Sequence, residues 1–213
     1  MAIISICKPF WGSDKMGLTL RQRIEELRNK LVSVENLNRN ATGGDMKFYI
    51  FDYDPKEEMR VRTEIKKAIK ANPEEVVEFD LYQMMLDVIK DNGYFETIQN
   101  MEREYDKNLL LAEVFQPLLG LGKASNPILN KFKDSVEDDG KHIILVTGVG
   151  KSYPVVRSHT ILNNLQSLFK RNPVVMIYPG RYEVRKKMTL RLFDRLDDDN
   201  YYRAFPLIDR GEE

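Results

Sequence analysis

The strongest constraint on the fold is a pattern that occurs twice between residues 47 and 93: a short strand, an acidic residue and an amphipathic helix. Residues 47–51 and 76–79 are rich in the β-branched and aromatic side chains that favour strands. Asp54 and Asp80 then stand where a carboxylate can cap the first turn of a helix, and Pro55 suits a first helical position. Two such units in succession predict a right-handed βαβ arrangement with a parallel sheet.

The second half of the chain continues the alternation. Residues 143–146 and 174–178 are almost uniformly apolar, which is typical of strands covered on both faces. The helical periodicity that precedes them predicts a helical insertion around residues 94–138. Pro154 is expected to open a further helix, and two candidate edge strands follow near the C-terminus, at 190–192 and 201–208. The predicted fold class is α/β, with a mainly parallel central sheet and helices on both faces, similar to a degenerate P-loop or Rossmann scaffold.

The first helix is expected over residues 20–34, where apolar residues recur at spacings of four and three. Thr19 and Gln22 stand at the spacing of a capping box in front of it. The charged residues between the apolar positions, Arg23 among them, are interpreted as a solvated face.

Composition bounds the class of protein. The 33 Lys and Arg residues balance 33 Asp and Glu residues, so net charge does not drive the chain toward nucleic acid or a membrane surface. A single cysteine, Cys7, excludes an internal disulfide, and no apolar run approaches the roughly 18 residues of a membrane helix. We therefore expect a cytoplasmic protein without membrane contact, built as a flexible extension over residues 1–18 and one domain over residues 19–213.

A glycine-containing segment, GVGKS at residues 148–152, follows an apolar strand and ends like a phosphate-binding loop. The complete loop has another glycine five residues before Gly150, and that position is Leu145. A leucine inside the strand prevents the glycine-rich arch whose amides surround a phosphate. The segment is therefore interpreted as a tight turn from strand to helix.

Three carboxylates, Asp52, Asp54 and Asp80, are expected at strand ends, where paired carboxylates could bind Mg²⁺. Helix capping already explains Asp54 and Asp80, which leaves Asp52 as the least explained of the three. The two histidines, His142 and His159, have neither a cysteine partner nor the spacing of a zinc site. The sequence thus predicts a protein that is not an enzyme, with no catalytic residue, cofactor or metal.

Residues 181–195 contain six basic residues and two acidic ones, which permits contact with nucleic acid as an alternative. Three aspartates follow at residues 197–199 and offset this charge, which favours a protein interface. The tyrosines, arginine and phenylalanine within residues 201–205 are residue types that anchor such interfaces.

Three separated segments together resemble the BrxB family of BREX phage-defence systems. They are FYIFDYDP at residues 48–55, VTGVGKSYPVVRSHTILNNL at 146–165, and residues 178–205 with their ending LRLFDRLDDDNYYRAF. The resemblance covers most of the chain from Leu20 onward. This chain departs from the pattern in its long start, residues 1–18, and in a longer and more basic segment at residues 183–188.

The resemblance implies a component of a multi-protein bacterial system that blocks phage replication and marks host DNA by methylation. The resemblance implies no enzymatic activity for this chain. It implies an adaptor that works beside the phosphatase-like PglZ, the ATPase BrxC and the methyltransferase PglX. The residues that match the family motifs are the candidate partner-binding positions: Asp52, Tyr53, Asp54, Pro55, Gly148, Gly150, Tyr153, Pro154, Arg157, Asn163, Asn164, Gly180, Tyr182, Phe193, Asp198, Asn200, Tyr201, Tyr202, Arg203 and Phe205.

These observations lead to one hypothesis and two alternatives. The hypothesis is a non-catalytic scaffold that binds another BREX protein, with PglZ as the first candidate. Binding would use the carboxyl edge of the sheet, which is expected to contain the Asp52 and Gly148 loops and the Asn200 segment. The first alternative is a cryptic nucleotide-binding or phosphotransfer protein that uses Asp52 and Lys151. The second is a nucleic-acid-binding component that uses residues 181–195.

Overall fold

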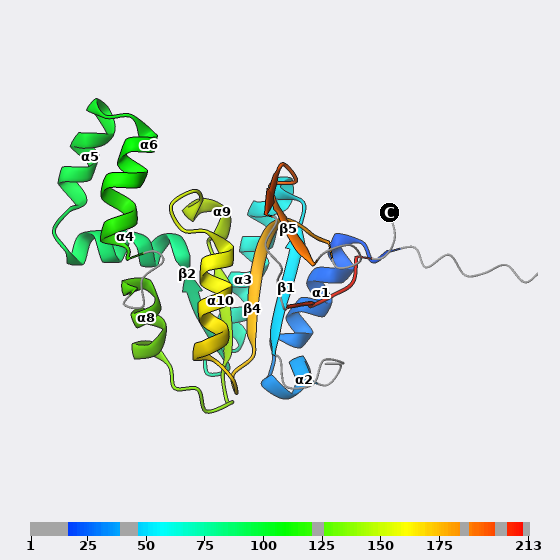
Figure 1. The fold of residues 1–213 in the computed structure, drawn as a ribbon. Helices are drawn as coiled ribbons and strands as arrows, with labels where there is room; N and C mark the ends of the chain where they lie inside the picture. The colour runs from blue at the N-terminus through cyan, green and yellow to red at the C-terminus, as the bar shows by residue number, and fades with distance from the viewer. Residues whose placement is uncertain (1–16, 39–46, 121–125, 184–187, 199–203, 211–213) are drawn as a thin grey trace, which may run out of the picture.

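The computed structural model describes residues 17–38, 47–120, 126–183, 188–198 and 204–210. Most of the expected N-terminal extension, residues 1–16, lies outside these ranges. The described residues form an α/β structure with a central sheet between helices (Figure 1).

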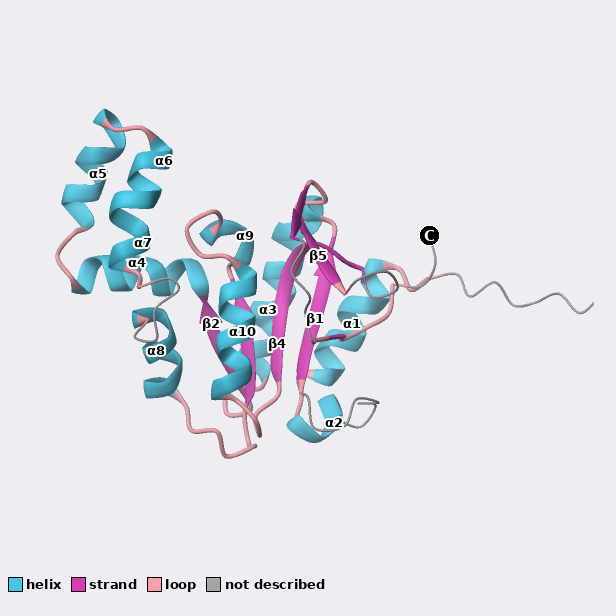
Figure 2. Ribbon diagram, viewed as in Figure 1, coloured by secondary structure: helices cyan, strands magenta, loops and turns pink. Residues whose placement is uncertain are grey.

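The sheet has a parallel core in the order β2 (Val76–Asp80), β3 (Ile143–Thr147), β4 (Val174–Glu183), β1 (Phe48–Tyr53) and β7 (Phe205–Pro206). β1 pairs with β4 over its whole length, from Phe48 opposite Val174 to Tyr53 opposite Pro179. β4 also pairs antiparallel with β5 (Thr189–Leu192), which pairs with β6 (Leu196–Asp198), so the sheet is mixed (Figure 2). The α/β class and the mainly parallel sheet are thus confirmed.

Helices cover both faces because the chain reverses its direction across the sheet. The connection from β1 to β2 runs to the far edge through η1 (Pro55–Glu57) and α3 (Glu58–Ala71), while the later connections return one strand at a time. Right-handed crossovers in opposite directions place their helices on opposite faces. α3 therefore lies with α1 (Leu20–Lys30) on one face, and the other face carries α4 (Leu81–Asp91), α8 (Pro127–Ser135) and α10 (Ser158–Leu168).

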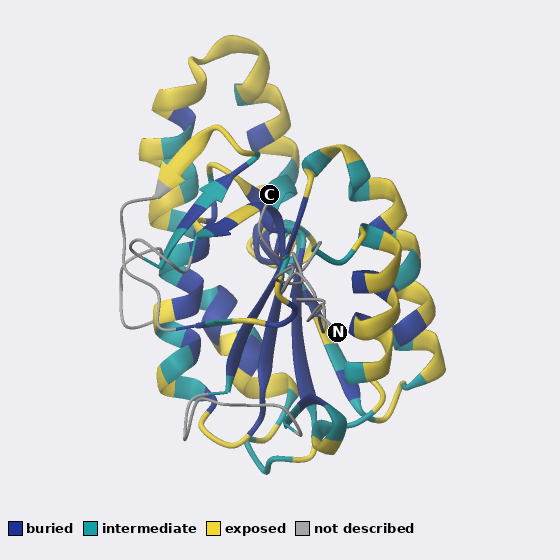
Figure 3. Ribbon diagram, turned by 90° about the vertical axis from the view of Figure 1, so that its right-hand side faces the viewer, coloured by how far each residue is buried: buried dark blue, intermediate teal, exposed yellow. Residues whose placement is uncertain are grey.

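Alternating residues of β1 divide the apolar core into two layers. Tyr49, Phe51 and Tyr53 pack with the side chains of α1 and α3, whereas Phe48 and Ile50 pack with those of the opposite face. Figure 3 shows the buried strands between helices whose outer surfaces are exposed. The predicted reason for the uniform apolar strands, burial on both faces, is confirmed.

The helical insertion is also found. It comprises α5 (Phe95–Glu104), α6 (Lys107–Leu110), the π-helical segment η2 (Leu111–Phe115) and α7 (Gln116–Leu118), followed by α8. α5 and α6 project away from the sheet at the upper left of Figure 1.

Three expected boundaries were wrong. The first helix is split, since α1 ends at Lys30 and a separate short helix, α2 (Val34–Asn38), follows. Pro154 does not open a helix: it lies between the short helix α9 (Val149–Ser152) and α10, after Tyr153 has adopted extended backbone with ψ 140°.

The fourth strand of the sheet is longer than the sequence predicted. β4 does not stop at the Pro-Gly pair but continues through it to Glu183. Gly180 permits this, because a Cβ atom there would lie 2.1 Å from the carbonyl oxygen of Arg191 on the neighbouring strand.

Candidate functional site

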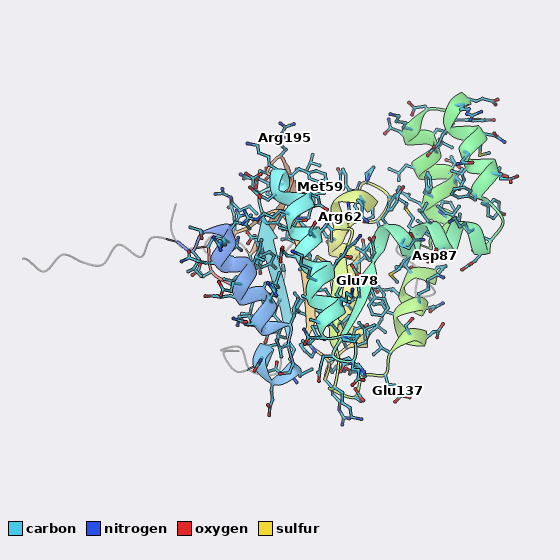
Figure 4. The ribbon with its side chains drawn as sticks, turned by 180° about the vertical axis from the view of Figure 1, so that it is seen from behind. Met59, Arg62, Glu78, Asp87, Glu137 and Arg195 are labelled. Carbon is cyan, nitrogen blue, oxygen red and sulfur yellow. The ribbon has the colours of Figure 1, made fainter. Side chains whose placement is uncertain are left out.

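The carboxyl ends of β1 to β4 meet at one edge of the sheet, the upper edge in Figure 1, where α/β proteins place their ligands and partners. This carboxyl edge holds a small charged pocket, a buried ion cluster and an aromatic pair, Tyr153 and Phe193, of which Tyr153 is exposed. Figure 4 labels Met59 and Arg62 on α3, together with Glu78 on β2, from behind.

Asp80 and Lys151 form one wall of the pocket. Lys151 Nζ lies 2.5 Å from Asp80 Oδ2, and the other carboxylate oxygen of Asp80 accepts hydrogen bonds from the amides of Tyr82 and Gln83 at the start of α4. Asp80 is therefore the helix cap that the sequence predicted. Its carboxylate also pairs with Lys151, the lysine that would contact the ligand's phosphates in a complete phosphate-binding loop.

Gly148 makes this arrangement possible. Its backbone is left-handed, with φ +74°, and a Cβ atom at this position would lie 2.1 Å from Asp80 Oδ1. Only glycine leaves room for the carboxylate and takes this conformation without strain. The prediction of a tight turn after β3 is confirmed, and Leu145 is fully buried inside the strand.

Two side-chain hydrogen bonds hold other residues that line the pocket. The hydroxyl of Tyr53 donates to Glu58, and the hydroxyl of Thr147 donates to Glu78 Oε1 at 2.7 Å. Burial, together with the bond to Glu58, raises the pKa of Tyr53 far above its ordinary value, so this phenol stays protonated. The pocket has about 40 Å³ of space for water, enough for one or two molecules and far below the several hundred Å³ of a typical ligand site.

Asp52 is the centre of the buried ion cluster. Arg23 Nη2 donates to Asp52 Oδ1 at 2.8 Å, and the backbone amide of Tyr182 donates to Asp52 Oδ2 at 3.1 Å. A second guanidinium, that of Arg210, has its Nε 3.4 Å from the same oxygen. The carboxylate thus joins α1, β4 and the C-terminal segment, which explains why a charged residue stands within an otherwise apolar strand.

Arg23 corrects the interpretation of α1 as carrying only solvated charges. Its side chain is buried, 3% of the residue is exposed, and its guanidinium lies 4.9 Å from the centre of the Phe51 ring. Burial lowers the pKa of Arg23, and the charge of Asp52 opposes that shift. The sequence did contain a signal: Arg23 stands four residues before Leu27 and therefore shares its buried helical face.

Several motif residues pack together beside the pocket. The rings of Tyr153 and Phe193 meet edge to face with centroids 6.5 Å apart. Gly150 packs closely against Phe193, since a Cβ atom there would lie 2.9 Å from the Phe193 ring and 3.0 Å from Pro179. The family motifs around residues 148–153 and 180–193 therefore belong to one structural unit.

The structure does not bring all motif residues to this edge. Asn163 and Asn164 lie in the middle of α10, and Asn164 donates to the carbonyl of Thr160 within the same helix. Phe205 lies in β7, opposite Tyr49 in the first half of β1. The remaining predicted positions divide into those near the edge, Tyr53, Asp54, Pro55, Pro154, Arg157, Gly180 and Tyr182, and those outside the described residues, Asn200, Tyr201, Tyr202 and Arg203. For Asp198 only the backbone, at the end of β6, is described.

The basic segment does form a hairpin, made by β4 and β5. Arg191 within it lies 2.5 Å from Asp197 and 3.8 Å from Glu183, and the bond to Asp197 raises the pKa of Arg191. Part of the basic charge is thus neutralised by the neighbouring aspartates, as the sequence suggested. Residues 184–187 lie outside the described ranges.

The described ranges contain neither a metal-binding cluster nor a membrane-spanning helix. There, no group of three or more His, Cys, Asp or Glu side chains is placed to bind a metal ion. Within the same ranges, no helix has the length and apolar character needed to cross a membrane.

The fold and the carboxyl edge define an α/β protein in which charged side chains of that edge form ion pairs with one another. Comparison with known proteins gives its family. Residues 77–207 match the family model described as BREX protein BrxB. The chain is 36% identical over 195 residues to a BREX protein BrxB of Bacillus cereus (strain H3081.97), covering 90% of this chain and 98% of the relative. It is 26% identical over 191 residues to a BREX protein BrxB of Escherichia coli O9:H4 (strain HS), covering 89% and 92%.

The chain therefore belongs to the BrxB family, which confirms the resemblance inferred from the three sequence segments. Membership in a BREX system implies a role in phage defence and makes other BREX proteins plausible partners. No solved structure matches the chain.

Proposed function

We propose that this protein is a non-catalytic adaptor of a BREX system that binds another BREX protein, PglZ first among them, at the carboxyl edge of its sheet. The observation that carries the proposal is the exposure of large apolar side chains there. Met59 in the first turn of α3 is 71% exposed, and Tyr153 and Leu196 are also exposed. These are three of the seven exposed large hydrophobic residues in the described part of the chain, and such residues anchor protein interfaces.

The charged residues of the edge support a binding role over a catalytic one. Lys151 is held by Asp80, and Asp52 is held by Arg23, so the two groups on which a nucleotide or phosphotransfer site would depend already have partners. The small volume of the pocket beside Lys151 agrees with this. We propose that the sheet is a degenerate P-loop or Rossmann-like scaffold that has kept the strand-turn-helix geometry without a phosphate-binding arch.

The reduced state implied by a single cysteine in 213 residues supports the cytoplasm as its compartment. PglZ would be the direct partner in this proposal, with BrxC and PglX as the alternatives. A nucleic-acid role through the β4–β5 hairpin has less support, because Arg191 is committed to Asp197 and Glu183.

The test is a binding measurement with purified PglZ. Met59→Arg and, separately, Tyr153→Ala should each weaken binding at least tenfold, because both side chains are exposed and can change without disturbing the core. Val32→Arg is the control, since Val32 is 44% exposed and adjoins α2 at the opposite edge of the sheet. Undiminished binding of PglZ by both edge variants would overturn the proposal that this edge is the binding surface.

The rival nucleotide-binding function has its own measurement. Thermal unfolding with ATP and Mg²⁺ should give an unchanged midpoint. Binding at a hundredfold excess over Kd would add about 2.7 kcal/mol to stability, so a clear rise in the midpoint would favour the rival.

A further inference from the structure

We infer that the projecting helices of residues 94–119, hereafter the lobe, form a second docking surface, and that its partner is a protein with a basic surface. The inference rests on the proposed adaptor function and deepens it, because an adaptor with two separate surfaces can hold two proteins at once. The lobe comprises α5, α6, η2 and α7 and is distinct from the carboxyl-edge surface around Met59.

The first observation is where the apolar side chains of the lobe lie. One side of it packs on the core through Ile98 and, at its base, Phe95 and Leu118. Elsewhere in the lobe Tyr94, before α5, and Tyr105 and Leu109, after it, are each between 47% and 49% exposed. These three and the three at the carboxyl edge account for six of the seven exposed large hydrophobic residues among those described. Exposed large apolar side chains are therefore found mainly in the lobe and at the carboxyl edge.

Tyr105 lies in the turn that joins α5 to α6, and Leu109 lies in the short helix α6 that follows it, at the tip of the lobe. Asp106 fixes this turn, since its carboxylate accepts hydrogen bonds from the amides of Asn108 and Leu109. The two apolar side chains are thus presented on the capped turn and on the helix that it starts. A preformed surface loses less conformational entropy on binding than a flexible one.

The second observation is charge. Within residues 94–119 five acidic residues, Glu96, Glu102, Glu104, Asp106 and Glu113, face only two basic ones, Arg103 and Lys107. Because the whole chain is neutral, the remainder carries the matching excess of positive charge. The lobe is therefore an acidic projection on a neutral protein.

These carboxylates also have no salt-bridge partner among the described residues, in contrast to Glu64 of α3. Glu64 on α3 lies 2.8 Å from Lys67 and 3.8 Å from Arg28, and the bond to Lys67 together with nearby arginines lowers the pKa of Glu64. None of the five lobe carboxylates forms an ion pair with a residue in the described ranges. They are available to cations on a partner.

The sign of this charge selects the partner. DNA, RNA and anionic lipid surfaces are polyanions and would be repelled by the lobe. A protein surface rich in lysine and arginine would be attracted, and shallow apolar pockets on it would receive Tyr105 and Leu109. The π-helical turn at Leu111–Phe115 adds support, because such turns occur frequently at functional sites.

The experiment measures affinity for each purified protein encoded in the same BREX operon, offered singly to the full chain. Two double variants of the lobe are used. One combines Tyr105→Ala with Leu109→Ala, and the other combines Glu102→Lys with Glu104→Lys. Their controls are Val32→Ala for the apolar change and Glu26→Lys, at an exposed position on α1, for the charge change. All altered side chains are exposed, and thermal unfolding verifies that each variant keeps the native fold.

We expect at least one of these proteins to bind, with affinity reduced tenfold or more by each lobe variant and less than twofold by each control. The wild-type affinity should fall as NaCl rises from 50 to 300 mM, and less steeply for the charge-reversed variant. Unchanged affinity in both lobe variants, or no binding to any of these proteins, would overturn the inference. Self-association that the lobe variants abolish would assign the lobe to a second copy of the chain instead.

The two proposals fail separately. Met59→Arg changes only the carboxyl edge, so its loss of binding beside normal binding by the lobe variants would retain the proposed function and reject the lobe. Loss of binding in the lobe variants alone would retain the lobe as a docking surface and reject the carboxyl edge.

Discussion

Arg23 Nη2 on α1 lies 2.8 Å from Asp52 Oδ1 at the end of β1, and both side chains are less than a tenth exposed. The pair fixes the first helix to the strand that runs between β4 and β7. The neighbouring Arg210 extends it to the C-terminal segment. The position that sequence reasoning could least explain is thus an internal tie of the fold.

Removing one partner of this pair should destabilise the protein strongly. Arg23→Met leaves the buried Asp52 with a weaker partner in Arg210, and we expect a loss of about 3 kcal/mol, the lower end for a broken buried pair. The double variant Arg23→Met, Asp52→Leu should lose less than the two single changes added together, because no charge is left alone. Urea unfolding measures all three. A loss below about 1 kcal/mol for Arg23→Met would contradict a structural role for the pair.

Gly148 offers a matched test of crowding against backbone strain. Gly148 and Gly93 share φ +74°, but a Cβ atom at Gly93 meets nothing within 4 Å, whereas at Gly148 it would lie 2.1 Å from Asp80 Oδ1. Gly93→Ala should therefore cost about 1 kcal/mol, from the left-handed backbone alone. Gly148→Ala should cost more, since Asp80 must also move. Equal losses in chemical denaturation would show that Asp80 moves without penalty.

The sequence predicted those elements whose signals are local. The capping box of Thr19 and Gln22 is present, and Asp54 and Asp80 accept hydrogen bonds from helix amides as expected. β3 and β4 were found because burial on both faces requires uniformly apolar residues, and β1 and β2 were found from their β-branched and aromatic residues. The departure of Leu145 from the phosphate-binding pattern also correctly indicated a tight turn.

The rest depended on contacts between distant residues. The burial of Arg23 is explained by Asp52, twenty-nine positions later, and by a backbone carbonyl at Ile208. β4 passes through a Pro-Gly pair because β5 lies beside it, which no property of residues 174–183 reveals. The exposure of the lobe was likewise hidden, since its helical periodicity resembles that of any packed helix.

The acid-side stability of the protein should depend on Asp138. Burial opposes ionisation there, but hydrogen bonds from the backbone amides of Asn172, Lys170 and Arg171 prevail and lower the pKa of Asp138 below its ordinary 3.8. A carboxylate whose pKa is lower in the folded state than in the unfolded state stabilises the protein at any pH above its unfolded-state pKa. This stabilisation is lost as the pH falls through the folded-state pKa.

Asp138→Asn should therefore be less stable than wild type at pH 7, and the difference should shrink below about pH 4. Urea unfolding of both proteins between pH 7 and pH 3 measures it. Because every other carboxylate is common to the two proteins, their difference isolates this residue. A gap that stays constant with pH would show that the asparagine merely repacks the turn.

The last prediction concerns Asp80 and Lys151 and separates capping from ion pairing. Asp80→Ala removes both the cap of α4 and the partner of Lys151, so we expect a loss of about 1–2 kcal/mol. Lys151→Met leaves the cap intact, and because both side chains are near 30% exposed the lost pair should cost below about 1 kcal/mol. Thermal and urea unfolding of the two variants give the comparison. A larger loss for Lys151→Met would reverse this ranking and direct attention to its second neighbour, the Tyr82 ring, whose centre lies 5.4 Å from the ammonium group.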